Sequence, residues 1–297
     1  MAGERVEENA WGSWVVREGK PQDIEPLRDY ESIITDLLVL AAWCLRGKER
    51  VFVDVGANVG RYVVPAAKVY SKVYAVEPDP DNLEALYRNI ELNSVSDRVV
   101  VVPKALGSAP GRARLAQSGA QSRIADEGVE VDVDTLDNCC PGAKVVKIDV
   151  EGYELEVVKG ALRTIEENKP ILIIEHHEYV FGLKPTWHPE IARILRDKGY
   201  VAIRVRYPHF LYIHRDVFEK CCALVRHGIG SHIFHEKILP NIVSGKPWYY
   251  GLSGTWWYGM DIPEYIKFAP KNIGCEEAYS LAEEEMDKAV SGKVFRF

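Results

Sequence analysis

The sequence lacks a long apolar run, an excess of positive charge and a cationic leader. No stretch approaches the ~18 apolar residues of a membrane span, so we expect none. The chain has 37 Lys and Arg against 44 Asp and Glu, and its net charge of −7 argues against a general polyanion binder, although a local basic patch stays open. Residues 1–10 are acidic and polar, unlike a secretory signal, so we expect a cytoplasmic protein.

The sequence also lacks any C-x-x-C pair. Its six cysteines are Cys44, the adjacent pairs Cys139–Cys140 and Cys221–Cys222, and Cys275. Adjacent cysteines do not have the spacing of a zinc knuckle or a redox motif, so we expect buried thiols in a reducing compartment. A structural disulfide stays open as an alternative, because intracellular disulfides occur in hyperthermophiles.

Short β-branched runs alternate with helical segments over the middle of the chain. The predicted strands are Val51–Val55, Lys72–Val76, Arg98–Val102, Lys144–Val150 and Ile171–Glu175, and the predicted helices are Arg61–Tyr70, Pro80–Leu92 and Tyr153–Glu167. Between the third and fourth strands, residues 107–137 predict a loop with one short edge strand. Apolar strands that alternate with helices predict an α/β fold, in which helices cover both faces of a parallel sheet.

The two ends of the chain follow other patterns. Residues 1–28 show no clear period and predict an irregular arm, which leads into a helix within Tyr30–Leu45. The later predicted elements are a helix at His188–Lys198, a sixth strand at Tyr200–Arg206, an antiparallel seventh at Phe210–His214, and helices at Asp216–Arg226 and Cys275–Ser291. We therefore expect an N-terminal arm and helix (residues 1–48), a main domain (49–214) and a C-terminal extension (215–297).

An aromatic stretch within the extension, residues 246–259, is punctuated by glycine and contains Trp248, Trp256 and Trp257. Aromatic rings dominate ordinary protein cores, so we expect this stretch to pack against the main domain. A stacking wall for the acceptor and the interface of a homodimer are the alternatives.

The run from Val53 to Gly60 (VDVGANVG) points to a cofactor. It ends a strand and opens a helix, so Gly56 permits a tight turn and a close backbone approach to a ligand, and the first helical N–H groups favour an anion. Glu77, followed by Pro78, lies at the end of the second strand. A carboxylate there can accept hydrogen bonds from both ribose hydroxyls of an adenosine cofactor.

This turn does not have the G-x-G-x-x-G spacing of a dinucleotide site. Asn58 stands where the second glycine would be, and Asp54 suits a cationic amino group better than a pyrophosphate. The pattern therefore favours S-adenosylmethionine, with an NAD-dependent oxidoreductase and a non-catalytic binding module as alternatives. The fourth strand lacks the Asn/Asp-Pro-Pro-aromatic motif of amino-methylating nucleic-acid enzymes, so we expect no nucleic-acid partner.

From Tyr30 to Glu175 the chain resembles the FkbM family of S-adenosylmethionine-dependent methyltransferases. The matching pieces are Tyr30-Glu31, Phe52–Gly60, Val73–Pro78, Asn89–Asn93, Ala105–Gly107, Asp134–Asp137, Lys147–Glu154 and the strand that ends at Glu175. The resemblance implies a Rossmann-like class I methyltransferase fold with a seven-stranded, mostly parallel sheet. It also implies O-methylation of a hydroxyl, with a glycan or another small molecule as the acceptor.

The resemblance also implies which residues contact S-adenosylmethionine. Glu77 and Pro78 would lie at the ribose, and the backbone of Ala105 and Leu106 would lie near the adenine. The methionine end would lie near Glu31 and the turn residues Gly56, Ala57, Asn58 and Gly60. We also predict that Asp54, because of its charge, and Asp149 contact the cofactor.

Methyl transfer to a hydroxyl needs a proton acceptor as well as positioning. Alternation along the fourth strand puts Lys147, Asp149 and Glu151 on one side, at the strand end where open α/β sheets bind ligands. We predict that Asp149 and Glu151 orient or deprotonate the acceptor, with His176 as a general base; capping of the next helix is the structural alternative.

We expect no resident metal ion. The alternative is a divalent ion held by Asp149, Glu175 and one histidine, since some class I O-methyltransferases hold one with carboxylates at these two strand ends.

Overall fold

The computed structural model describes residues 3–27, 32–45, 49–177, 188–206, 208–233 and 274–291. The chain divides into two compact units, Met1–Leu27 with Leu45–Pro185 and Arg28–Cys44 with Thr186–Phe297. This division differs from the boundaries that we expected after residues 48 and 214. Within the described ranges, no helix is both long and apolar enough to cross a membrane.

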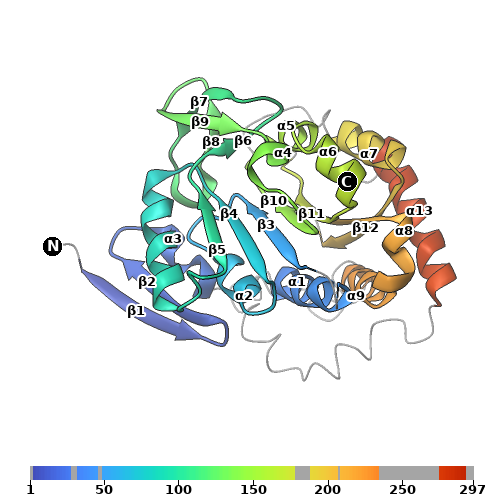
Figure 1. The fold of residues 1–297 in the computed structure, drawn as a ribbon, viewed down its shortest axis with the longest axis horizontal. Coiled ribbons are helices and arrows are strands. Elements are labelled where there is room, and N and C mark those ends of the chain that lie inside the picture. The colour runs from blue at the N-terminus through green and yellow to red at the C-terminus, as the bar shows by residue number, and fades with distance from the viewer. Residues whose placement is uncertain are drawn as a thin grey trace, which may run out of the picture. The chain divides into compact units, whose positions relative to one another are not determined.

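The first unit is built on a parallel sheet with the strand order β11-β10-β3-β4-β5 (Figure 1). These strands are β3 (Val51–Val55), β4 (Lys72–Val76), β5 (Val99–Val102), β10 (Val145–Ile148) and β11 (Ile171–Glu175). The helices of this unit are α2 (Val63–Ala67), α3 (Pro80–Leu92), α4 (Leu136–Cys139), α5 (Glu154–Lys159) and α6 (Leu162–Asn168). The prediction of an α/β fold with a mainly parallel sheet is confirmed.

The strand order reverses between β3 and β10. From β3 the chain continues to β4 and β5 on one side, whereas β10 and β11 lie on the other side. In open parallel sheets such a reversal is the place where ligands bind, at the carboxyl ends of the strands. The register pairs Asp54 of β3 with Lys147 of β10 at this place, so two charged residues interrupt otherwise apolar, buried strands.

Residues 105–134 form a second sheet, and the predicted loop with one edge strand was wrong. Its order is β6-β9-β7-β8, from β6 (Ala105–Leu106), β7 (Gly111–Ala116), β8 (Arg123–Ala125) and β9 (Val129–Asp134), with a 3₁₀ turn at Gly119–Gln121. The alternating valines predicted β9 correctly. Its neighbour β7 was missed because Leu115 is its one fully buried residue, so the strand has no apolar alternation of its own.

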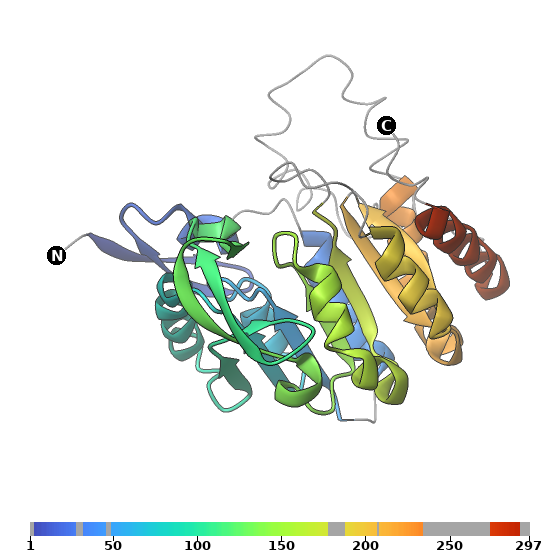
Figure 2. The same cartoon turned by 90° about the horizontal axis from the view of Figure 1, so that it is seen from above.

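The N-terminal arm is a β-hairpin, so the prediction of an irregular arm was also wrong. The hairpin pairs β1 (Glu4–Asn9) with β2 (Gly12–Arg17), and a 3₁₀ turn follows at Pro21–Leu27. Neither strand alternates, because Val6 is the single apolar residue of β1 and β2 buries three consecutive residues from Trp14 to Val16. The hairpin lies beside α3 in both ribbon views (Figures 1 and 2).

The second unit contains two antiparallel strands and several helices. They are α1 (Ser32–Cys44), α7 (His188–Asp197), β12 (Tyr200–Arg206), β13 (His209–His214), α8 (Arg215–Phe218), a 3₁₀ turn at Glu219–Cys221, α9 (Cys222–Ile233) and α13 (Cys275–Ser291). The antiparallel pairing of β12 with β13 confirms the prediction for these strands, and α9 and α13 both contact β12.

A disulfide joins Cys222, the first residue of α9, to Cys275, the first residue of α13. The expectation of thiols alone was therefore wrong for Cys222 and Cys275. Cys221, which is adjacent to Cys222 in the sequence, stays a buried thiol. Cys44, Cys139 and Cys140 are also free thiols. The aromatic stretch 246–259 lies outside the described residues.

Candidate active site

The segment from Gly56 to Gly60 forms a tight turn between β3 and α2. Gly56 has a φ of +84°, and a Cβ at this position would lie 1.8 Å from the carbonyl oxygen of Asp149, so the close approach of the two chain segments requires glycine. The N–H groups of Gly56 and Ala57 both donate to the carbonyl oxygen of Val76, at 3.0 and 2.9 Å. The turn is thereby attached to β4, and Gly56 lies against Asp149, the residue after β10.

Glu77 supports this turn from the end of β4. Its Oε2 accepts a hydrogen bond of 2.8 Å from the backbone N–H of Asn58, and its Oε1 accepts from the N–H of Asp79 (2.9 Å) and from Asn82 Nδ2 (3.4 Å). Burial raises the pKa of Glu77 to about 7, although these donors oppose the shift. A carboxylate has about four acceptor positions, so these three donors leave capacity for a ligand hydroxyl. Pro78, which follows, is half-buried.

Asp54 and Lys147 form a buried pair at the centre of the sheet. Lys147 Nζ lies 3.9 Å from Asp54 Oδ1, 2.8 Å from Asp149 Oδ2 and 4.7 Å from the centroid of the Tyr62 ring. Among the described residues neither oxygen of Asp54 has a hydrogen-bond partner, and the side chain is 0% exposed. Burial raises the pKa of Asp54 to about 7; Lys147 opposes this shift and Asp149 adds to it.

A buried carboxylate without hydrogen bonds is costly unless another group satisfies it. Asp54 lies just before the turn, so it is suited to the cationic end of a ligand. Burial alone would lower the pKa of Lys147, but attraction to Asp149, Asp54 and Glu175 raises it.

A cluster of carboxylates surrounds His177, two residues beyond the end of β11. Its Nδ1 lies 2.8 Å from Glu154 Oε1. Its Nε2 lies 3.4 Å from Glu151 Oε2, 3.5 Å from Glu175 Oε1 and 3.7 Å from Asp149 Oδ1. Burial alone would lower the pKa of His177, but the hydrogen bond to Glu154 and the attraction of the carboxylates raise it to about 10.

The geometry favours His177 over His176, which we predicted as the general base. Side chains alternate along an extended chain, so Glu175 and His177 share a face and His176 is directed away from it. His176 is 1% exposed. His177, the other histidine of the same Glu-His-His run, lies among these carboxylates, and the general-base role of His176 stays a prediction.

Asp149 and Glu151 lie together, as the alternation of the fourth strand predicted, and Lys147 contacts Asp149. Burial raises the pKa of Glu151 to about 7, opposed by His177. Neither carboxylate caps α5, whose N-cap Tyr153 makes no side-chain capping bond. Instead Glu154 Oε1 accepts from the N–H groups of Gly152 (3.0 Å) and Val150 (3.3 Å).

Two other predicted groups have different outcomes. Ala105 and Leu106 form the short strand β6 with buried side chains, and their contact with adenine stays a prediction. Glu31 lies outside the described residues.

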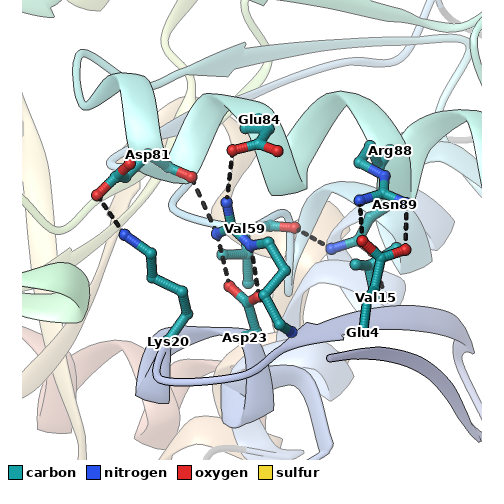
Figure 3. A network of polar contacts seen from close by, with 10 residues as sticks. Glu4, Val15, Lys20, Asp23, Val59, Asp81, Glu84, Arg88 and Asn89 are labelled. Atoms are coloured by element: carbon teal, nitrogen blue, oxygen red, sulfur yellow. Dashed lines mark hydrogen bonds and ion pairs between the residues drawn. The ribbon is translucent and has the colours of Figure 1, made fainter. Parts of the chain in front are cut away.

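A polar network joins the N-terminal hairpin to α3 and to the cofactor turn (Figure 3). The buried Asn89 of α3 donates to the carbonyl oxygen of Val59 and accepts from the N–H of Val15, each at 2.8 Å. Arg17 of β2 contacts Asp23 at 2.7 Å and Glu84 at 3.0 Å, and Lys20 contacts Asp81 at 2.6 Å. Asn89 therefore positions the turn. From the sequence alone, the resemblance of the run Asn89–Asn93 to the family gave Asn89 no structural role.

Residues 54–202 match the family model of the methyltransferase FkbM domain. The hexuronic acid methyltransferase AglP of Haloferax volcanii is 28% identical over 197 residues, which cover 60% of this chain and 78% of that protein. The methyltransferase sdnD of Sordaria araneosa is 29% identical, over 52% of this chain and 74% of its own length. Among solved structures, methyltransferase FkbM from Methylobacillus flagellatus superimposes with a TM-score of 0.43 at 24% identity, over 56% of this chain and 44% of that chain.

Proposed function

The chain belongs to the FkbM methyltransferase family, and on this premise we propose that it is an S-adenosylmethionine-dependent O-methyltransferase. The proposed acceptor is a hydroxyl group of a sugar, a glycan or another small molecule. Similarity to a hexuronic acid methyltransferase supports a sugar acceptor. The net charge of −7 supports a small-molecule or glycan acceptor over a nucleic acid.

The observation that carries the proposal is the turn from Gly56 to Gly60 between two buried carboxylates. Glu77 lies on one side with its acceptor capacity partly used, and Asp54 lies on the other with both oxygens lacking hydrogen bonds among the described residues. These groups fit S-adenosylmethionine, whose ribose presents two hydroxyls and whose methionine end carries an ammonium group. A pyrophosphate would place its negative charge near Asp54.

When bound, S-adenosylmethionine supplies a sulfonium methyl group that a hydroxyl oxygen can take in an in-line displacement. The protein has to hold the acceptor and receive its proton. Asp149, Glu151 and His177 lie together beyond the carboxyl ends of β10 and β11. The two carboxylates are proposed to receive the proton, and His177, whose pKa of about 10 keeps its imidazole protonated at neutral pH, is proposed to hold the acceptor. Glu154 keeps the imidazole of His177 in one orientation through the 2.8 Å contact to Nδ1.

The cofactor is tested by calorimetric titration with S-adenosylhomocysteine and, separately, with NADH. We expect micromolar binding of S-adenosylhomocysteine, sharply weaker binding by Glu77→Ala, and no signal from NADH. Glu91→Ala, which removes an exposed carboxylate of α3, is the matched control and should bind as the wild type does. Binding of NADH alone would favour an oxidoreductase, and unchanged affinity of Glu77→Ala would contradict the ribose assignment.

The acceptor is tested by transfer of a radiolabelled methyl group to an oligosaccharide that contains hexuronic acid. Label that is stable to mild base identifies an ether, as O-methylation of a hydroxyl requires, whereas base-labile label identifies a methyl ester. Cofactor binding without transfer to any tested hydroxyl would favour the non-catalytic binding module.

The seven-stranded layout of the sheet is part of the same proposal. A class I methyltransferase sheet has seven strands, and we assign β12 and β13 as the last two of them. A cytoplasmic location and the contacts of Glu31, Ala105 and Leu106 with the cofactor stay predictions.

A further inference from the structure

His177 and its acidic neighbours have the spacing of ligands around a metal ion. The Nε2 atom lies 3.4–3.7 Å from one oxygen each of Glu151, Glu175 and Asp149. Hydrogen bonds are shorter, with N···O distances of about 2.7–3.2 Å. Atoms that each lie about 2.0–2.2 Å from one tetrahedral ion are about 3.3–3.6 Å apart. These oxygens are therefore too far from Nε2 for good hydrogen bonds, and their distances from Nε2 are close to those between ligands of one ion.

The other ring nitrogen of His177 has the partner that metal-binding histidines usually have. Its Nδ1 contacts Oε1 of Glu154, at 2.8 Å, and the Glu154 side chain is 0% exposed. Histidines that bind metals usually donate their second N–H to a carboxylate, which fixes the tautomer and directs the free nitrogen at the ion. Oε1 of Glu154 also accepts from the N–H of Gly152, so the carboxylate is itself held in place.

The cluster contains a buried carboxylate oxygen without a hydrogen-bond partner. Among the described residues, Glu151 Oε2 is buried without a hydrogen-bond partner, and it is the carboxylate oxygen nearest to His177 Nε2. The His177 side chain is 8% exposed, and its Nδ1 contacts Glu154. Four carboxylates contact this single imidazole and Lys147 contacts one of them, Asp149, so a divalent ion would offset negative charge that these two cations leave.

We propose that Asp149, Glu151 and His177 bind a divalent metal ion, with Glu175 beside them. One imidazole with several carboxylates suits a first-row ion such as Mn²⁺ or Zn²⁺ better than Ca²⁺, which prefers oxygen ligands alone. Binding of the ion does not depend on the methyltransferase reaction. Its role does rest on the proposed function: the ion would hold the acceptor hydroxyl and make loss of its proton easier.

The test is titration of the metal-free full chain with Mn²⁺, read by the loss of the electron paramagnetic resonance signal of free Mn²⁺. We expect one saturable site per chain. Glu151→Gln keeps the shape of the side chain, and it removes an oxygen without a hydrogen-bond partner, so it should leave folding intact. We expect it to weaken binding by about 10- to 100-fold or more, the range seen even when supporting residues of metal sites are changed. His177→Gln should do the same.

Glu156→Gln is the matched control, since it makes the same change on α5, and its carboxylate has other partners, Lys159 at 3.0 Å among them. Its affinity for Mn²⁺ should equal that of the wild type. Absence of saturable Mn²⁺ and Zn²⁺ binding by the wild type would overturn the proposal, as would equal affinities of Glu151→Gln and Glu156→Gln. The same preparations are titrated with S-adenosylhomocysteine, so that Mn²⁺ binding without cofactor binding would refute the proposed function and leave the metal site standing.

Discussion

Replacement of Lys147 by methionine should reveal how strongly the buried charge of Asp54 depends on its partner. Methionine fills nearly the same volume without the charge, so the packing against Tyr62 changes little. Lys147 is 1% exposed, and the carboxylate of Asp54 would lose the one cation that contacts it among the described residues. An isolated charge in this position is expensive, because water does not reach it.

The expected size follows from the separation of the pair. At the 3.9 Å between Nζ and Oδ1, two unit charges attract by about 4 kcal/mol at an effective dielectric constant of about 20. Removal of one partner from a buried ion pair typically costs about 3–5 kcal/mol. We therefore expect Lys147→Met to lower the free energy of unfolding by about 3–5 kcal/mol at pH 8.

The loss should depend on pH, and its sign follows from the pKa of Asp54. Folding raises this pKa from 3.8 to about 7, so protonation of Asp54 favours the folded state at low pH, and this contribution disappears as pH rises through about 7. Without Lys147 the pKa rises further. At pH 5.5 folded Asp54 is neutral in both proteins, so the part of the loss due to Asp54 disappears and the part due to the 2.8 Å contact of Lys147 with Asp149 remains. The total loss caused by Lys147→Met should therefore be smaller than at pH 8.

Urea unfolding at both pH values, followed by circular dichroism, measures these free energies. Lys104→Met is the matched control: Lys104 contacts Asp134 at 2.8 Å, but its side chain is 38% exposed, so its loss should cost at most about 1 kcal/mol. The reasoning is refuted if Lys147→Met and Lys104→Met cost the same at pH 8, or if the cost of Lys147→Met does not fall at pH 5.5. In the double variant with Asp54→Asn, the two effects should be non-additive by about 1–3 kcal/mol.

Three further substitutions probe other parts of the structure. Gly56→Ala should cost about 1–3 kcal/mol or more and weaken S-adenosylhomocysteine binding, because the added Cβ would lie 1.8 Å from a backbone oxygen at a φ of +84°. Asn89→Ala should lower stability by about 2–4 kcal/mol in thermal unfolding, because it leaves two buried backbone groups without partners. Cys222→Ser should cost about 4 kcal/mol by the chain-entropy estimate for a disulfide between residues 53 positions apart, measured by urea unfolding.

Each of these substitutions has a control elsewhere in the described structure. Gly111→Ala meets nothing within 4 Å and should change stability by less than about 0.5 kcal/mol. Asn138→Ala removes one exposed hydrogen bond, and Cys139→Ser removes a free thiol, so both should have small effects. Equal losses from Gly56→Ala and Gly111→Ala would contradict the close packing of the turn. If Asn89→Ala and Asn138→Ala had the same melting temperature, the positioning role of Asn89 would be contradicted. If reductant left the stability of the wild type unchanged, the disulfide would be contradicted.

Patterns over a few neighbouring residues were sufficient to predict the strands whose own residues are mostly apolar. The five parallel strands β3, β4, β5, β10 and β11 are short, largely apolar runs, so the sequence predicted all five within two residues of their observed bounds. The same holds for the turn, because its conformation needs glycine at particular positions. Asp54, Glu77, Asp149 and Glu151 were recognisable because each is a charge at the end of an apolar strand.

The N-terminal hairpin and the second sheet depended on partners that are distant in sequence. β1 has almost no apolar residues. β2 is buried because α3 covers it, and Asn89 of α3 accepts a hydrogen bond from the N–H of Val15. A window of neighbouring residues does not contain this information. The disulfide also depends on residues that are distant in sequence. Cys275 pairs with Cys222, and Cys221 stays a thiol, because of where α9 and α13 begin in space.

By itself the sequence determined the α/β class, the tight turn after β3 and the carboxylates beside it, since these follow from burial and backbone freedom at single strand ends. The tertiary structure decided which groups meet. Asp54 and Lys147 become partners through the register of β3 with β10, and the choice between His176 and His177 depends on the face of the extended chain that turns toward Glu151 and Glu154. Those contacts join strand ends far apart in the chain, so the chemistry of the site is a property of their packing.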